Sequence, residues 1–208
     1  MDIANALFLV FVIMFSAVIH EVMHGVAADW LGDKTARYAG RLTLNPIPHL
    51  DPVGSVLLPL FFTLTGSPIF FGWAKPVPYN PYNLRPGRFS EAIVAGAGPL
   101  SNLVIAAVFG LIIRMSVFGA MVNNVLLLVV VVNTMLFLFN LLPIPPLDGS
   151  KIVSAILPRA LSRGYDRWRS SVEQNPFFGM GLVLLVVVLL GDMFGGAVYS
   201  LATFIAGM

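Results

Sequence analysis

The chain of 208 residues contains no cysteine, and charged residues make up only 11% of it. The lack of cysteine excludes a disulfide framework and any metal site built on thiolates. The scarcity of charge excludes an ordinary soluble domain, in which about 25% of the residues are charged. Any metal that the chain binds must therefore be held by histidine and carboxylate side chains.

Apolar sequence takes the place of charge. Hydrophobic residues make up 58% of the chain and the mean hydropathy is +0.88. Several apolar runs have the roughly 20 residues that a helix needs to cross a bilayer. We therefore expect an all-α polytopic membrane protein with about four to five transmembrane helices, in a single domain over residues 1–208. The net charge of +2 is small, so the expected partner is the lipid bilayer and not nucleic acid.

One short motif, His20-Glu21-Val22-Met23-His24, ends the first apolar run. On a helix, His20 and His24 lie on the same face and can bind one Zn²⁺, while Glu21 can reach a water molecule beside the metal. This is the H-E-x-x-H pattern of zinc hydrolases, in which the glutamate is the general base. Two histidines near lipid headgroups are the alternative, but ionisable groups in a membrane helix are costly unless function requires them.

A catalytic zinc site also needs a third protein ligand and one open position. Asp148 is the best candidate, because the segment Leu142-Pro-Ile-Pro-Pro-Leu-Asp-Gly149 breaks an apolar run. Unwound backbone at membrane depth is tolerated where it lines a protein cavity. His49 and Asp51 are spare potential ligands, although positions in an interfacial loop explain them more simply. Asp192 is expected at an interfacial helix end.

The topology of residues 52–72 decides whether these groups can meet. If this apolar but Gly- and Pro-interrupted segment is re-entrant, eleven of the twelve Lys and Arg residues lie on one side of the membrane. If it crosses fully, the split is eight to four. The positive-inside rule favours re-entry, which places the N-terminus outside and the metal toward the cytosolic face. A full crossing is the alternative.

Two further segments have predicted roles in the fold. Residues 37–44 alternate in polarity and could form a strand, and the proline-rich residues 72–88 predict an extended strip in the headgroup zone. Asn102 is a polar side chain in an apolar run, so we expect it to hydrogen-bond to a neighbouring helix.

Three motifs together resemble the site-2 protease family of intramembrane zinc metalloproteases, in a minimal form without PDZ or CBS domains. They are the His20–His24 motif, Gly98-Pro-Leu-Ser-Asn102, and Asn140-Leu-Leu-Pro-Ile-Pro-Pro-Leu-Asp148-Gly149, in the family's order. The resemblance implies that the zinc ligands are His20, His24 and Asp148. It also implies that Glu21 is the catalytic base and that Asn140 helps to hold the substrate or the oxyanion.

The resemblance further implies regulated intramembrane proteolysis, in which transmembrane segments of single-span membrane-tethered proteins are cleaved. The expected location is a cell membrane, the prokaryotic plasma membrane. The resemblance also implies that the region between the first helix and Gly98 forms a short membrane-embedded β strip. An unwound substrate could pair with an edge strand there, at residues 37–44 or 73–79. A non-catalytic membrane scaffold and a metal transporter are the alternatives. The sequence does not indicate the substrate, the cleavage position, the gate or the oligomeric state.

Overall fold

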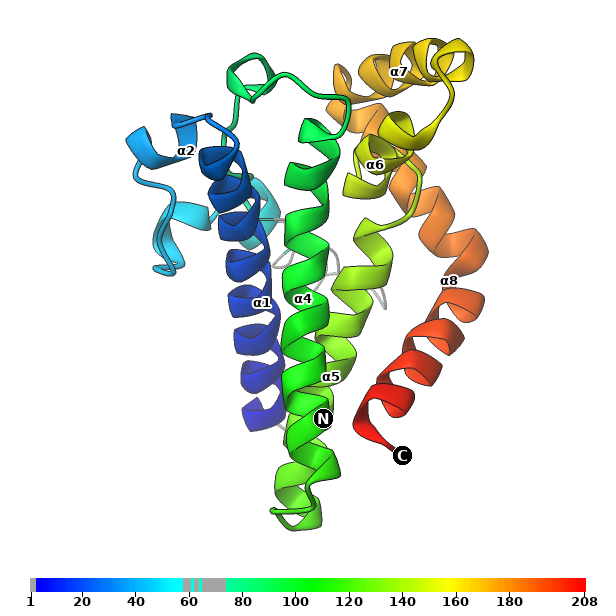
Figure 1. The fold of residues 1–208 in the computed structure, drawn as a ribbon. Helices are drawn as coiled ribbons and strands as arrows, with labels where there is room; N and C mark the ends of the chain where they lie inside the picture. Colours follow the sequence, from blue (N-terminus) through cyan, green and yellow to red (C-terminus); the bar gives the residue numbers. More distant parts are fainter. Residues whose placement is uncertain (1–2, 58–60, 62–63, 65–73) are drawn as a thin grey trace. The chain divides into compact units, whose positions relative to one another are not determined.

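The computed structural model describes residues 3–57, 61, 64 and 74–208 (Figure 1). The chain divides into two compact units, Met1–Leu84 and Arg85–Met208. Every regular element in the described ranges is helical. The predicted all-α class is therefore confirmed for this part of the chain. We describe each unit by itself.

The first unit is built on one long helix, α1 (Ile3–Trp30), whose residues Leu7–Trp30 are long and apolar enough to cross a membrane. The short helix α2 (Thr35–Tyr38) packs against α1. Three single-turn elements complete the regular structure of the described residues. They are the 3₁₀ turn η1 (Ile47–His49), the π-helical segment η2 (Pro52–Leu57) and the 3₁₀ turn η3 (Pro81–Asn83).

The predicted β strip is not confirmed, since the described residues contain no strand. Residues 37–44 begin inside α2 and leave it through a turn in which Gly40 adopts a φ of 65°. Residues 74–80 are non-helical but pair with no strand. The predicted re-entrant segment 52–72 begins with the helical turn η2, and most of its remainder lies outside the described residues.

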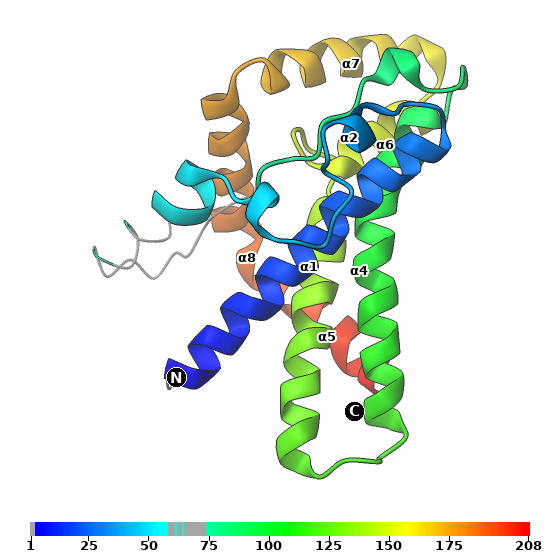
Figure 2. The ribbon, with the colours of Figure 1, turned by 90° about the vertical axis from the view of Figure 1, so that its left-hand side faces the viewer.

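The second unit contains three further helices of membrane-spanning length. They are α4 (Ser90–Arg114), α5 (Ala120–Asn140) and α8 (Pro176–Ala206). Two shorter helices, α6 (Asp148–Ile156) and α7 (Arg159–Glu173), join α5 to α8. Figures 1 and 2 show α4 and α5 side by side, joined at one end by a short loop, with α6 and α7 at the opposite end. With α1, the described residues contain four candidate spans, as the apolar runs predicted.

Small side chains let these helices approach closely. The buried core of the second unit is formed by residues of α4, α5 and α8, namely Ala106, Ile113, Val130, Ala202 and Ala206. A Cβ added at Gly110 would lie 2.5 Å from the Ile205 side chain, so α4 and α8 can touch only because this position is glycine. Close packing of small residues is a main source of helix association within a membrane.

A buried polar pair joins α4 to α5. The side-chain amide of Asn102 donates to the side-chain oxygen of Asn133 at 2.9 Å, and Asn133 in turn donates to the carbonyl of Val129 at 2.9 Å. Both asparagines are fully buried. The prediction that Asn102 bonds to a neighbouring helix is confirmed.

The loop that follows α1 is organised around Asp33. This buried carboxylate accepts four hydrogen bonds of 2.5–3.1 Å, from the N–H and hydroxyl of Thr35, the N–H of Asn80 and the amide of Asn83. Burial by itself raises the pKa of Asp33, but these hydrogen bonds lower the pKa below its ordinary value of 3.8. Asp33 therefore fastens the segment before α4 to the end of α1.

Replacing Asp33 by alanine is expected to destabilise the protein by at least about 2 kcal/mol, because hydrogen bonds to a charged group contribute about 1.5–3 kcal/mol each. A carboxyl whose folded pKa is lowered stabilises the fold above its unfolded pKa and loses that contribution as the pH falls below it. Thermal unfolding in detergent, followed from neutral pH to below pH 3.8, measures both effects. Asp29→Ala is the control, since its partners Lys34 and Arg37 are largely exposed. An acid profile that is the same in Asp33→Ala and wild type would contradict this role.

Candidate metal centre

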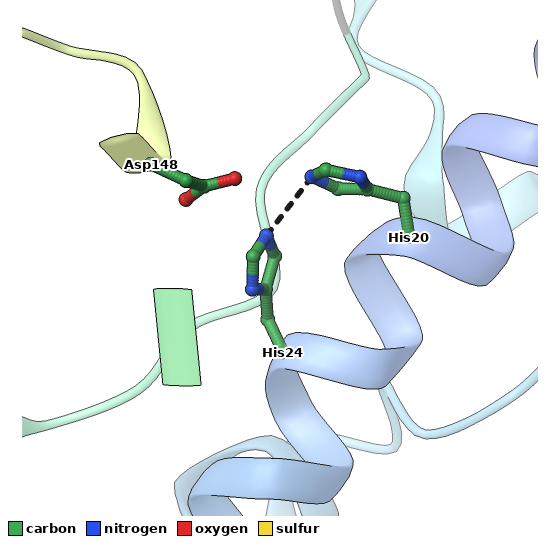
Figure 3. A group of neighbouring side chains, drawn as sticks. All are labelled: His20, His24 and Asp148. Carbon is green, nitrogen blue, oxygen red and sulfur yellow. Dashed lines mark hydrogen bonds between the residues drawn. The ribbon is translucent and has the colours of Figure 1, made fainter. Parts of the chain in front are cut away.

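The two histidines of the motif lie on successive turns of α1 and face each other. Their Nε2 atoms are 3.0 Å apart, as the dashed line in Figure 3 shows. Two imidazole nitrogens that bind one tetrahedral zinc ion at about 2.0–2.1 Å lie roughly 3.3 Å apart. The spacing of His20 and His24 therefore fits a single metal ion, as the four-residue separation predicted.

Glu21 points away from the histidine face, since adjacent residues on a helix are about 100° apart. Its Oε2 atom accepts a hydrogen bond of 2.8 Å from the backbone N–H of Val77. No hydrogen bond to the second oxygen, Oε1, comes from the part of the chain that the structure describes. Glu21 therefore lies beside the histidines and is not a third member of their face.

Asp148 is the first residue of α6 in the second unit, and Figure 3 shows its side chain as sticks. The backbone before it is held by Ser150, whose hydroxyl donates to the carbonyl of Leu147 at 2.7 Å. A Cβ added at Gly149 would collide with the carbonyls of Leu141 and Leu142. This glycine lets α6 start directly against the end of α5, so the position of Asp148 is set by close backbone packing.

Asn140 is the last residue of α5, and its side-chain amide donates to the carbonyl of Leu136 at 2.9 Å. The amide is thus turned back onto its own helix. To donate to a substrate it would have to give up this bond, which its rotatable side chain allows.

His49 and Asp51, the spare potential ligands, have structural partners. The Nε2 atom of His49 lies 2.9 Å from the carbonyl of Thr43. Asp51 begins η2 by accepting hydrogen bonds from the N–H groups of Val53 and Gly54, at 3.0 and 2.7 Å. These contacts agree with the simpler interpretation, in which both residues organise a loop. The expectation that Asp192 lies at a helix end is wrong, since it lies exposed within the continuous helix α8.

A short strip, residues 74–80, is held by contacts with the loop after α1 that sequence patterns did not predict. The N–H of Lys75 donates to the carbonyl of His49 at 2.8 Å. The buried guanidinium of Arg41 donates to the carbonyls of Lys75 and Pro76, at 2.8 and 3.3 Å. These groups and the Val77 N–H are therefore already bonded within the first unit, and pairing of residues 73–79 with a substrate strand stays a prediction.

Gly25 makes the approach of the strip possible. A Cβ at this position would lie 2.6 Å from the Leu42 side chain and 2.9 Å from that of Val77. Any larger residue would push residue 77 away from the helix turn that carries Glu21. The glycine that directly follows the motif is thus part of the same arrangement.

The chain therefore combines helices of membrane-spanning length with a histidine pair and an adjacent glutamate, the features of a membrane-embedded metallohydrolase. The sequence model of peptidase family M50 matches residues 112–188. YwhC of Bacillus subtilis (strain 168), whose name describes a candidate zinc metalloprotease, is 35% identical over 190 residues, which cover 87% of this chain and 80% of YwhC. The chain belongs to peptidase family M50, the family of the site-2 proteases, and is a multi-pass membrane protein.

Two relatives named Rip2, also described as candidate zinc metalloproteases, extend the comparison. Rip2 of Mycobacterium tuberculosis (strain H37Rv) is 31% identical over 191 residues, covering 90% of this chain and 70% of that protein. Rip2 of Mycolicibacterium smegmatis is 32% identical over 139 residues, covering 65% of this chain and 52% of that protein. No solved structure matches the chain.

Proposed function

We propose that the protein is a zinc-dependent intramembrane endopeptidase that cleaves transmembrane segments of single-span membrane proteins. The observation that carries the proposal is the histidine pair on α1, with its Nε2 atoms 3.0 Å apart and Glu21 on the adjoining face. Membership of family M50 and the names of the relatives, which describe zinc metalloproteases, support the same reaction.

The proposed zinc ligands are His20, His24 and Asp148. The donor set suits zinc, since two imidazoles and one carboxylate with one open position are typical of catalytic zinc sites. The charge distribution of each unit supports their meeting at one membrane face. In the first unit, all basic residues follow α1. In the second, Arg114 is the one basic residue at the far ends of α4 and α8, and the others lie at the end that carries Asp148. By the positive-inside rule, both sets face the cytosol.

A zinc ion held by His20, His24 and Asp148 would supply a polarising charge that acidifies a water molecule and activates the scissile carbonyl. Glu21 takes the proton of the attacking water and later gives it to the leaving nitrogen. Asn140, once its amide leaves the Leu136 carbonyl, donates to the developing oxyanion. The substrate helix must unwind before it reaches these groups, because its carbonyls are otherwise bonded within the helix.

The function is tested by purifying the wild type and Glu21→Gln and measuring zinc per chain and cleavage of a labelled single-span protein. Comparing the membrane proteomes of cells that carry each form identifies the substrate class. An endopeptidase gives a single-span protein that accumulates intact with Glu21→Gln. A scaffold would hold such a protein without cutting it in either form. A transporter would move zinc across a vesicle membrane and cut nothing.

The re-entrant topology proposed for residues 52–72 predicts that Lys34 and Lys75 lie on the same, cytosolic side of the membrane. The chain has no cysteine, so Lys34→Cys and Lys75→Cys each introduce a single reactive thiol. An impermeant thiol reagent should label both from the cytosolic side. Ser116→Cys, near Arg114, is the control for the opposite side. If Lys34→Cys and Lys75→Cys are labelled from opposite sides, the segment crosses fully.

A further inference from the structure

Among the contacts of the first unit, the hydrogen bond from the Val77 N–H to Glu21 Oε2 links the motif helix to a residue 56 positions away. The bond measures 2.8 Å. Val77 is buried, with 5% of its surface exposed, so water competes poorly for the N–H group. This contact belongs to no secondary structure and needs another explanation.

The two residues that flank Val77 have no backbone N–H, so the N–H of Val77 is the single main-chain donor at this point. Pro76 and Pro78 flank it, and neither has a backbone N–H. Their rings also fix the backbone on both sides in an extended conformation. Val77 is thus the one residue of the Pro-Val-Pro sequence whose main chain can donate a hydrogen bond, and that hydrogen bond goes to Glu21.

The strip is anchored immediately before this donor. Arg41 bonds the carbonyls of Lys75 and Pro76, and the latter belongs to the same peptide group as the Val77 N–H. The Lys75 N–H bonds to the carbonyl of His49. The absence of a side chain at Gly25 lets Val77 pack directly onto α1. A buried cation, a main-chain bond and a close packing contact therefore fix one peptide group relative to Glu21.

We propose that the Val77 peptide is the positioning group of the general base: its N–H holds Oε2 of Glu21, so that Oε1 is the oxygen presented to the attacking water. A glutamate side chain has three rotatable bonds, and a base must be held within hydrogen-bond reach of the proton that it takes. Arg41 acts through the peptide and not on the substrate. This inference rests on the proposed function, because it assigns a role to a residue pair in that reaction.

Hydrogen exchange tests the contact without requiring activity. Because Pro76 and Pro78 have no amide hydrogen, mass spectrometry of the segment separates the Val77 amide readily from its neighbours. We expect Glu21→Ala to speed exchange at Val77 by at least about tenfold, since the acceptor is lost. Glu21→Gln is the matched control and should keep slow exchange, because its amide oxygen still accepts. Equal exchange in wild type and Glu21→Ala would overturn the proposal.

Enzyme kinetics test the positioning role. Val77→Pro removes the N–H while keeping a buried side chain of similar size in a strip that already favours proline. We expect kcat to fall by about 10- to 100-fold, because misplacement of a catalytic group by 1 Å can cost that much. KM and zinc per chain should stay close to wild type. The control variant Val77→Thr, which keeps the N–H and the branched shape, should retain most of the wild-type kcat.

The outcomes separate the proposal from a structural role and from the proposed function. A folded Val77→Pro protein with wild-type kcat, or one that has lost its zinc, would contradict positioning. If Val77→Pro does not fold, Arg41→Met decides instead, and it should raise exchange at Val77 and lower kcat with zinc retained. A wild type that cleaves no transmembrane substrate would refute the proposed function, while the exchange result would still establish or exclude the contact.

Discussion

A Glu21→Gln protein is expected to keep its zinc and its fold and to lose cleavage by at least about 100-fold, the lower end of what a positioned general base contributes. Glutamine has the shape of glutamate and can still accept the Val77 N–H, so the contact between α1 and the strip should survive. It cannot accept the proton of the attacking water. The measurement is zinc per chain and cleavage rate on the same purified samples.

The control for this experiment is His20→Ala, which should lose both zinc and cleavage because it removes one imidazole of the pair. Substrate binding should persist in Glu21→Gln, so that variant should retain an uncut transmembrane segment through purification. If Glu21→Gln cleaves at the wild-type rate, the proposed mechanism is wrong. If it loses zinc together with activity, Glu21 is a ligand and the site is built differently.

The features that the sequence predicted well depend on short-range rules. The four-residue spacing of His20 and His24 sets their common face on any helix, and uninterrupted apolar runs define membrane spans through length alone. The sequence could predict that Asn102 has a hydrogen-bond partner on another helix, since a buried amide in a membrane helix needs one. Its identity, Asn133, depends on how α4 packs against α5.

The features that the sequence did not predict depend on contacts between distant segments. Residues 37–44 alternate in polarity, yet α2 forms because Asp33 accepts the Thr35 N–H and starts a turn. The Asp-x-Thr spacing was a readable signal for that turn. The bond between Val77 and Glu21 has no such signal, since no spacing rule joins residues 56 apart. The flanking prolines indicate only that Val77 is the one available donor.

Asp148 shows how much depends on the surrounding backbone. A carboxylate after a broken apolar run is visible in the sequence, but the close packing of Gly149 on the end of α5 is not. That packing and the Ser150 hydroxyl fix where α6 begins. Its role as the third ligand stays a prediction, and removing the carboxylate tests it directly.

Replacing Asp148 by alanine is expected to weaken zinc binding by more than about 100-fold, because even loss of a residue that only supports a ligand costs about 10- to 100-fold. Cleavage should be lost with the metal. Zinc that binds only the folded protein raises its melting temperature, so wild type should be stabilised by added zinc and Asp148→Ala should not. The measurement is the melting temperature with chelator and with zinc, together with zinc per chain.

Two controls separate loss of a ligand from general damage to the fold. His49→Ala and Asp51→Ala remove residues whose described contacts are to the loop backbone, so both should keep their zinc response. Asp51→Ala should lose about 1 kcal/mol of stability, as for a lost helix cap, equally with and without zinc. Asp148→Ala should instead melt near wild type in chelator and differ only when zinc is present. Full zinc content in Asp148→Ala would mean that another residue is the third ligand, and a zinc response lost in His49→Ala would point to that histidine.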